Sequence, residues 1–201
     1  MGKSIKARWE WRSFSVNSMD SIIGKLHRLP LGNHKENRDV YVLSAQNGVN
    51  VKVRSDGVLD MKVMQESREG GFELWLPAYR CRAPFLPSHL ARLAAFFEIA
   101  MPELKRRSYS AEEFFNEFVP SCGGLRHFPV SKVRDIYAVD DVIMEVGEVS
   151  LFNDQYKTFC VESEKLESVM TVVRGFELEH DEPTNYVQLL KKWADEALDI
   201  F

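Results

Sequence analysis

The chain has 201 residues, of which 45% are hydrophobic and 28% charged, with a net charge of −4 at neutral pH. This composition is typical of a soluble globular protein with one sizeable core. We find no apolar stretch long enough to cross a bilayer and no apolar segment near the start that would act as a secretion signal. The three cysteines (Cys81, Cys122 and Cys160) form no C-x-x-C pair. These features predict a cytoplasmic protein with no membrane partner, and they argue against a disulfide framework or a zinc ribbon.

The net charge hides an asymmetry along the chain. Residues 1–82 are net positive, whereas residues 83–201 are net negative. A general nucleic-acid binder would present a basic domain or stripe, so we expect no extended nucleic acid as a partner. Opposite charges from the two halves would meet if one half folds onto the other. Acidic exposed helices in the second half would explain the net negative charge of residues 83–201 equally well.

The first part of the chain reads as strands with one short helix. Trp9 and Trp11 alternate with charged residues in a predicted strand over residues 4–14, and a helix follows over 18–28. The polar residues 33–38 are predicted to form a loop. A meander and one further strand come next, at residues 39–45, 49–54, 58–64 and 72–76. Asn-Gly and Asp-Gly pairs at 47–48 and 56–57 supply hairpin turn signals.

The second part begins with a helical insert over about residues 84–124. Ser110 and Glu113 form a capping box there, and the phenylalanines behind it predict the core stripe of the insert. Strands resume at 128–137, 142–151 and 156–163, and helices follow at 164–174 and after Thr184. Eight strands with helices segregated in the middle and at the end predict an α+β fold.

Charged residues lie two apart in five of these strands. The sets are Arg8, Glu10 and Arg12; Lys52 and Arg54; Asp60 and Lys62; Lys132 and Arg134; and Glu162 and Glu164. Because successive side chains of a strand point to opposite faces, each set occupies one face. For any single pair, the solvated face of an antiparallel sheet is the ordinary interpretation. Five strands together favour a pocket of cations and carboxylates, which suits a polyanion held with a divalent metal.

The order of these segments resembles the CYTH superfamily, the triphosphate tunnel metalloenzymes. Arg8-Trp9-Glu10-Trp11-Arg12 is similar to the N-terminal E-x-E-x-K strand of that family, with Arg8 in place of the first Glu. Further similar segments are Asp39-Val40-Tyr41, Val51-Lys52-Val53-Arg54, Met61-Lys62, Lys132-Val133-Arg134, Val161-Glu162-Ser163-Glu164 and Thr184-Asn185-Tyr186. The resemblance implies a single domain over residues 1–201 with the helical insert. Its fold would be an eight-stranded antiparallel barrel whose tunnel binds triphosphate groups with Mg²⁺ or Mn²⁺.

The resemblance also implies roles for individual residues. Glu10 and Lys62 become candidate catalytic residues, and Glu10, Glu162 and Glu164 candidate ligands of Mg²⁺ or Mn²⁺. The candidate phosphate-binding residues are Arg8, Arg12, Lys52, Arg54, Lys62, Lys132 and Arg134. Glu164 is equally suited to the first turn of the following helix. Arg8 removes a metal ligand and adds a cation, which favours phosphate binding over metal-dependent turnover.

Three functions stay open on this basis. The first is metal-dependent hydrolysis of a triphosphate-containing small molecule, either inorganic tripolyphosphate or a nucleoside or thiamine triphosphate. Adenylate cyclase activity has less support, because no residue selects adenine or a ribose hydroxyl. The second is non-catalytic binding of phosphates or nucleotides without full metal ligation. The third is a protein-interaction domain that uses the helical insert. Analogy with the fold is compatible with a homodimer.

Overall fold

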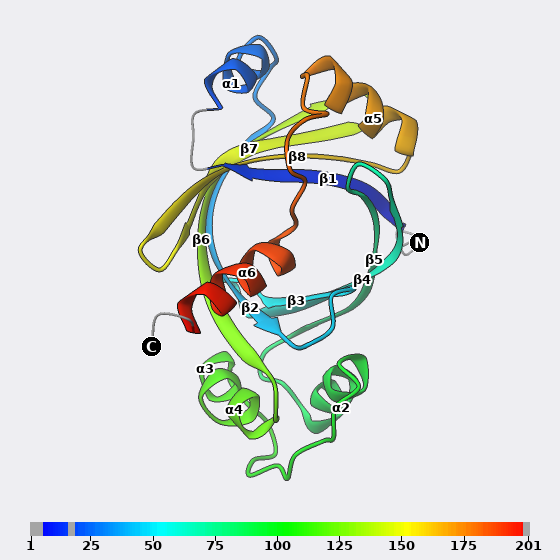
Figure 1. Cartoon of the computed structure of the whole chain (residues 1–201). Coiled ribbons are helices and arrows are strands. Elements are labelled where there is room, and N and C mark those ends of the chain that lie inside the picture. Colours follow the sequence, from blue (N-terminus) through cyan, green and yellow to red (C-terminus); the bar gives the residue numbers. More distant parts are fainter. Residues whose placement is uncertain (1–5, 16–18, 199–201) are drawn as a thin grey trace.

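Eight antiparallel strands close into a barrel in the computed structural model, which describes residues 6–15 and 19–198 (Figure 1). The strand order is β1-β5-β4-β3-β2-β6-β7-β8. The strands are β1 (Arg8–Ser15), β2 (Asn33–Leu43), β3 (Val49–Val53), β4 (Val58–Arg68), β5 (Phe72–Arg82), β6 (Arg126–Val139), β7 (Val142–Leu151) and β8 (Asp154–Ser163). This architecture confirms the predicted α+β fold with a closed eight-stranded barrel.

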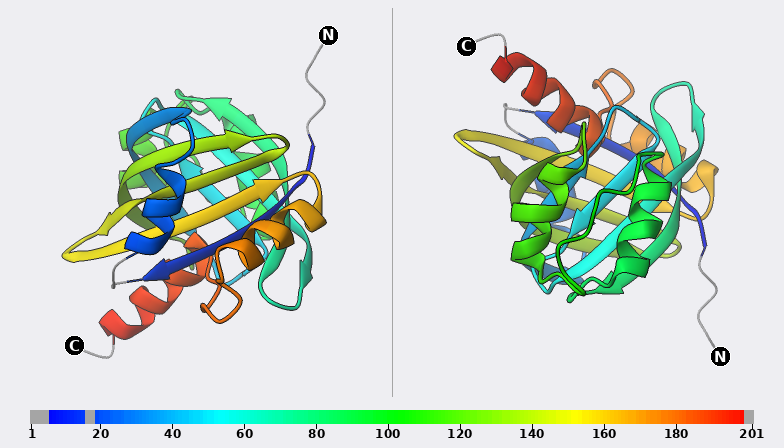
Figure 2. Two further views of the ribbon diagram at one scale, coloured as in Figure 1. Left: turned by 90° about the horizontal axis from the view of Figure 1, so that it is seen from above. Right: turned by 90° about the horizontal axis from the view of Figure 1, so that it is seen from below.

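Helices cover two opposite sides of the barrel (Figures 1 and 2). One side carries α1 (Asp20–Leu26) and α5 (Leu166–Gly175). The other carries the helical insert, which consists of α2 (Pro87–Phe96), α3 (Ala111–Glu113), the π-helix η1 (Phe114–Phe118) and α4 (Val119–Ser121). Among the helices of the described residues, none is long and apolar enough to cross a membrane.

The apolar faces of the strands point outward, under these helices. Trp9 and Trp11 pack in one hydrophobic cluster with Val169 of α5. On the opposite side, Met61 packs in a second cluster with Phe114 of the insert. The second finding confirms the predicted phenylalanine stripe in the core of the insert. Because side chains alternate along a strand, the charged faces of the same strands are turned into the barrel.

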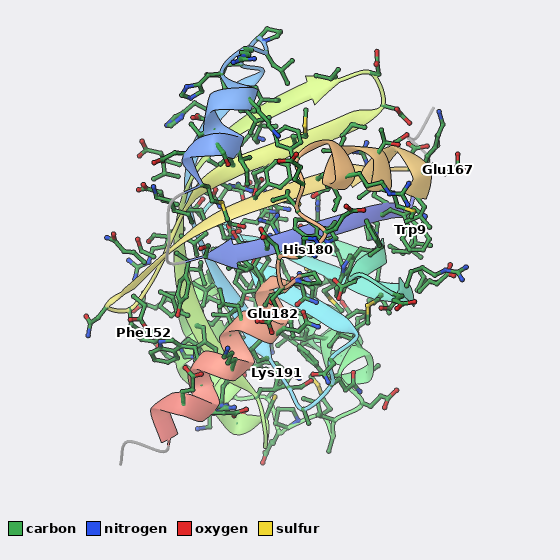
Figure 3. All side chains as sticks on the ribbon, turned by 45° about the horizontal axis from the view of Figure 1, so that its top comes forward. Trp9, Phe152, Glu167, His180, Glu182 and Lys191 are labelled. Atoms are coloured by element: carbon green, nitrogen blue, oxygen red, sulfur yellow. The ribbon has the colours of Figure 1, made fainter. Side chains whose placement is uncertain are left out.

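The last helix, α6 (Tyr186–Leu198), lies across one opening of the barrel (Figure 1). Its apolar side, which includes Tyr186, packs in a cluster with Tyr41 and Val130 of the barrel wall. Farther along α6, Trp193 stacks on Phe152, with ring centroids 4.4 Å apart. Phe152 lies in the β7–β8 turn (Figure 3). The ammonium group of Lys191 donates hydrogen bonds to two carbonyl groups of the β2–β3 connection. These contacts fix α6 over the barrel interior.

Two predicted boundaries differ from the structure. Residues 33–38 were expected to form a loop, but they are the first half of β2 and pair with β6 from Asn33 opposite Ile136 to Arg38 opposite Ser131. Strand β5 also continues to Arg82 instead of ending near residue 76. These segments are mostly exposed, so backbone pairing with a neighbouring strand, and not apolar alternation, makes them strands. Residues 4, 5 and 18 of the predicted elements lie outside the described residues.

A glycine on β7 is required by the close approach of β6. Gly147 lies opposite Arg134, and a Cβ atom at position 147 would come within 2.3 Å of the Val133 carbonyl oxygen and 2.8 Å of Arg134 Cγ. We expect Gly147→Ala to lower the free energy of unfolding by about 1–3 kcal/mol, because the neighbouring strand must shift. Urea unfolding would measure the change. The matched control is Gly24→Ala on α1, where nothing lies within 4 Å. It should stabilise the protein slightly, and equal losses in both variants would contradict the explanation.

Candidate functional site

The register of the strands turns the predicted charged residues into the barrel. Residues directly opposite each other in an antiparallel pair share one face. Glu10 lies opposite Glu162 of β8 and Glu73 of β5, and Arg12 lies opposite Cys160. Since Trp9 and Trp11 face the outer helices, this set faces the interior, which we call the tunnel. The expected convergence of cations and carboxylates on one surface is therefore present in the fold.

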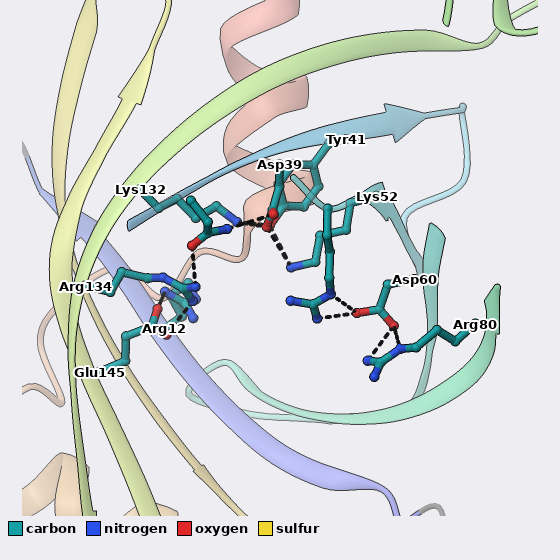
Figure 4. Close-up of polar contacts among 11 residues, drawn as sticks. Arg12, Asp39, Tyr41, Lys52, Asp60, Arg80, Lys132, Arg134 and Glu145 are labelled. Carbon is teal, nitrogen blue, oxygen red and sulfur yellow. Dashed lines mark hydrogen bonds and ion pairs between the residues drawn. The ribbon is translucent and has the colours of Figure 1, made fainter. Parts of the chain in front are cut away.

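One group of tunnel contacts is built around Asp39. Its Oδ2 atom accepts a hydrogen bond from Lys132 Nζ at 2.8 Å, and Lys52 Nζ lies 3.4 Å away (Figure 4). The side chains of Asp39 and Lys132 are each only 1% exposed. Burial raises the pKa of Asp39, but the charges of Lys52 and Lys132 outweigh it and hold that pKa well below its ordinary value. Burial lowers the pKa of Lys132 far below its ordinary value, and neighbouring Lys52 lowers it further.

A second group is built around Glu145 on β7. Arg12 Nη1 donates to one carboxylate oxygen of Glu145 at 3.2 Å, and Arg134 Nη1 donates to the other at 2.7 Å (Figure 4). Arg12 Nε also donates to Glu10 Oε1 at 3.1 Å. Burial raises the pKa of Glu145, but Arg12 and Arg134 reverse this and leave it below its ordinary value. Glu145 therefore links two cations that the sequence assigned to phosphate.

A third group is built around Asp60 on β4. Arg54 contacts Asp60 Oδ2, with Nε at 3.0 Å, and Arg80 Nη2 donates to Oδ1 at 3.1 Å (Figure 4). Arg54 is partly exposed, while Asp60 is buried. Across the three groups, the predicted phosphate-binding residues Arg12, Lys52, Arg54, Lys132 and Arg134 all have a carboxylate partner within the protein. A phosphate group would have to share or replace these partners.

The other carboxylates of the tunnel form a cluster with a thiol. The ligand atoms of Glu10, Cys160 and Glu162 all lie within 4.8 Å of one another. Within the described residues, Glu162 has no hydrogen bond or ion pair, so its carboxylate oxygens are available to an incoming group. Burial and the charge of Glu10 raise the pKa of Glu162. Two carboxylates at this separation fit a divalent cation, which commonly takes one or two carboxylates together with water and phosphate oxygens.

Lys62 is the tunnel cation associated with this cluster. It lies opposite Asn50 on the inner face of β4. Burial lowers the pKa of Lys62, but the carboxylates of Glu10 and Glu162 outweigh burial and raise that pKa above its ordinary value. Lys62 is therefore protonated at neutral pH and has no hydrogen-bonded carboxylate among the residues described here.

Two predicted site residues are not part of this cluster. Glu164 lies beyond the end of β8, is exposed, and forms a surface ion pair in which its Oε2 is 2.7 Å from Lys6 Nζ. The E-x-E spacing placed it with Glu162, but the strand ends at Ser163, and the alternation of side chains ends with it. Arg8 lies opposite Trp75 near the start of β1 and has no hydrogen bond or ion pair within the described part of the chain.

Three tunnel residues were missed by the sequence analysis or given a different role. Glu73 accepts hydrogen bonds from Trp75 Nε1 at 3.0 Å and Asn185 Nδ2 at 2.9 Å. Because Glu73 and Trp75 are two residues apart on one strand, their side chains share a face, and this spacing in the sequence was a signal for their contact. Cys160 was not assigned to the site, although it precedes Glu162 by two positions and so shares its face. Glu145 was not assigned to the site because the sequence does not establish which face of β7 points inward.

The pairing around Asp39 predicts a measurable loss of stability. We expect Asp39→Asn to lower the free energy of unfolding at pH 7 by about 3–5 kcal/mol, because it leaves the buried Lys132 without its anionic partner. The folded-state pKa of Asp39 lies below its ordinary value of 3.8, so its stabilisation is present above that value and is lost as the pH falls through the folded pKa. The difference between variant and parent should therefore shrink at about pH 3.

Urea unfolding at both pH values tests this prediction, with the exposed Asp181→Asn as a control. A difference that is equally large at both pH values, or a control that loses as much stability, would contradict the assigned role of Asp39.

Comparisons with known proteins bear on the fold. Neither the scan of protein-family models nor the search of curated proteins gives a match. Among solved structures, a conserved hypothetical protein from Pyrococcus furiosus has a TM-score of 0.55 at 16% identity, covering 90% of this chain and 99% of that one. The PH1012 protein from Pyrococcus horikoshii OT3 has a TM-score of 0.53 at 16% identity, with 90% and 98% covered.

A candidate adenylate cyclase from Bacillus halodurans is similar over the same extent. Its TM-score is 0.52 at 14% identity, and the alignment covers 92% of this chain and 98% of that one. Identities this low establish the shared fold and leave substrate and catalysis to the residues of each chain. With its closed eight-stranded antiparallel barrel and charged interior, this chain has the fold of the CYTH proteins, the triphosphate tunnel family.

Proposed function

We propose that this protein hydrolyses a triphosphate-containing small molecule, with a divalent metal ion bound in the tunnel. One observation carries the proposal: strands from opposite ends of the chain bring Glu10 and Glu162 together, with Cys160 in the same cluster. Buried carboxylates that face each other are costly unless a cation joins them. The substrates that fit are inorganic tripolyphosphate and nucleoside or thiamine triphosphates.

Phosphoryl transfer requires positioning and charge neutralisation more than covalent help from the protein. Lys62 would contact the phosphate nearest the carboxylate cluster, since it carries a positive charge and lies near Glu10 and Glu162. Lys52 and Arg54, next to each other on the inner face, would bind the following phosphates. They would do so by giving up part of their contacts with Asp39 and Asp60.

Glu10 and Glu162 would hold the divalent metal ion, for which the family resemblance implies Mg²⁺ or Mn²⁺. The ion would supply charge neutralisation at the phosphate oxygens and would activate a water as the nucleophile. Arg12 contributes indirectly, because its hydrogen bond to Glu10 fixes the orientation of that carboxylate. The pKa of Glu10 lies below its ordinary value, since the nearby charges of Arg12 and Lys62 outweigh its burial. Glu10 is therefore an anion at neutral pH and able to act as a ligand.

Non-catalytic binding of a polyphosphate or nucleotide is the second candidate function. It is favoured by Arg8, which stands where the family pattern has a carboxylate, and by the internal pairing of most tunnel cations. A tunnel of this kind would still hold phosphate groups through charge-assisted hydrogen bonds. It would lack the full set of metal ligands needed for turnover.

Two glutamates at the end of β8, Glu162 within the strand and Glu164 just beyond it, test the proposed hydrolysis. We expect Glu162→Gln to reduce metal-dependent phosphate release from tripolyphosphate by about 100-fold or more, because it removes a charge from the metal site. Glu164→Gln is the matched control, since Glu164 pairs with Lys6 at the surface, and it should retain parental activity within about twofold. Phosphate release would be measured with Mg²⁺ and with Mn²⁺. Equal losses in both variants would contradict the assignment of the site.

Calorimetry separates the two candidate functions. We expect tripolyphosphate to bind the parent protein and Lys52→Met to weaken that binding about tenfold, through loss of one charge-assisted contact. The exposed Lys192→Met serves as the control and should bind as the parent does. If tripolyphosphate binds but is not hydrolysed with any of the added metal ions, the non-catalytic function is established. If tripolyphosphate, ATP and thiamine triphosphate all fail to bind, both candidates fail.

A further inference from the structure

Cys160 is a buried thiol in an unusually polar place. It lies on β8, is 1% exposed, and shares the inner face with its cross-strand partners Arg12 and Glu145. Its sulfur is within 4.8 Å of ligand atoms of both Glu10 and Glu162. Within the described residues the thiol has no hydrogen-bond partner. A buried thiol without a hydrogen-bond partner thus lies beside two carboxylates, and all three side chains are of types that bind divalent metal ions.

The other two cysteines have different surroundings. Cys122 is buried in the hydrophobic cluster of the helical insert, where it packs with residues such as Phe118. Cys81 lies opposite Leu59, on the outer face of the barrel, and packs against the same cluster. Packing among apolar side chains explains both of them. It does not explain Cys160, whose neighbours in the tunnel are charged.

The donor set is matched to a particular class of metal ion. Mg²⁺ requires an octahedral shell of oxygen atoms and binds sulfur poorly. Zn²⁺ and Co²⁺ accept a thiolate together with carboxylates, and Zn²⁺ is commonly four-coordinate. One thiolate and two carboxylates would leave a fourth position open for a water molecule or a phosphate oxygen. Arg8, at the position of a lost carboxylate, is consistent with a site that has fewer oxygen ligands.

We infer that Cys160 is the third metal ligand of this site, and that the site therefore selects a thiophilic divalent ion such as Zn²⁺ or Co²⁺ over Mg²⁺. The inference rests on the metal site of the proposed function and specifies which metal it takes. On binding, the sulfur–metal bond forms as the thiol gives its proton to the buffer, and no redox change occurs. Glu10 and Glu162 complete the protein ligands.

Cobalt absorption tests the ligand directly, without any measurement of activity. Co²⁺ would be titrated into the full chain with a phosphine reductant, which avoids competing thiols, while thiolate-to-cobalt charge transfer is followed in the near ultraviolet. We expect the band to appear, to saturate at one Co²⁺ per chain, and to persist in excess Mg²⁺. A variant with Cys81→Ser and Cys122→Ser should keep the band, which assigns it to the one remaining cysteine.

Cys160→Ser should abolish the band and weaken Co²⁺ binding by at least about tenfold, since even outer-shell partners of a metal site are worth that much. Circular dichroism would confirm that this variant is folded, and the double variant supplies the assignment if it is not.

Other outcomes would overturn the inference. Co²⁺ binding that depends on Glu162 but shows no thiolate band would mean a site made of carboxylates alone; it would overturn the role of Cys160 and leave the proposed hydrolysis intact. If Co²⁺, Zn²⁺ and Mg²⁺ all fail to bind, both the inference and the metal-dependent function are wrong.

Discussion

The internal pairing of buried charges is the constraint on which this barrel depends. The outer faces of its strands are covered by helices, so the charged faces have no place except the tunnel. An unpaired buried cation would cost several kcal/mol, and Asp39, Asp60 and Glu145 remove that cost for the cations they contact. Each of these carboxylates joins two cations from separate segments of the barrel wall. The same contacts therefore neutralise the tunnel and hold its wall together.

This pairing divides the tunnel into two regions with different chemistry. Around Asp39, Asp60 and Glu145, cations are satisfied by the protein, so a polyphosphate gains affinity there only by exchanging partners. Around Glu10 and Glu162 the balance is reversed, because carboxylates and a thiol gather with few donors. A substrate that brings both a metal ion and a chain of phosphates matches both regions. A phosphate without a metal matches one of them.

Sequence patterns predicted most strands and their inner faces well because alternation of apolar and charged residues is local information, whereas the closed barrel was implied by the family resemblance. Trp9 and Trp11 on one face already placed Glu10 and Arg12 on the other. Pairing partners were harder to predict, since Asp39 and Lys132 are brought together by the register of β2 with β6, which no local pattern encodes. Glu164 was placed with Glu162 because spacing does not reveal where a strand ends. Cys160 was not assigned to the site because only charged residues were considered there, although it lies two residues before Glu162.

The most direct test of this account is a crystal structure with Zn²⁺ and a non-hydrolysable tripolyphosphate analogue, with the metal located by anomalous scattering at the zinc edge. The account predicts an anomalous peak among Glu10, Cys160 and Glu162, with the phosphate chain extending past Lys62 toward Lys52 and Arg54. A peak outside the tunnel would contradict it. So would a tunnel in which the pairs of Asp39, Asp60 and Glu145 are unchanged and no phosphate is bound.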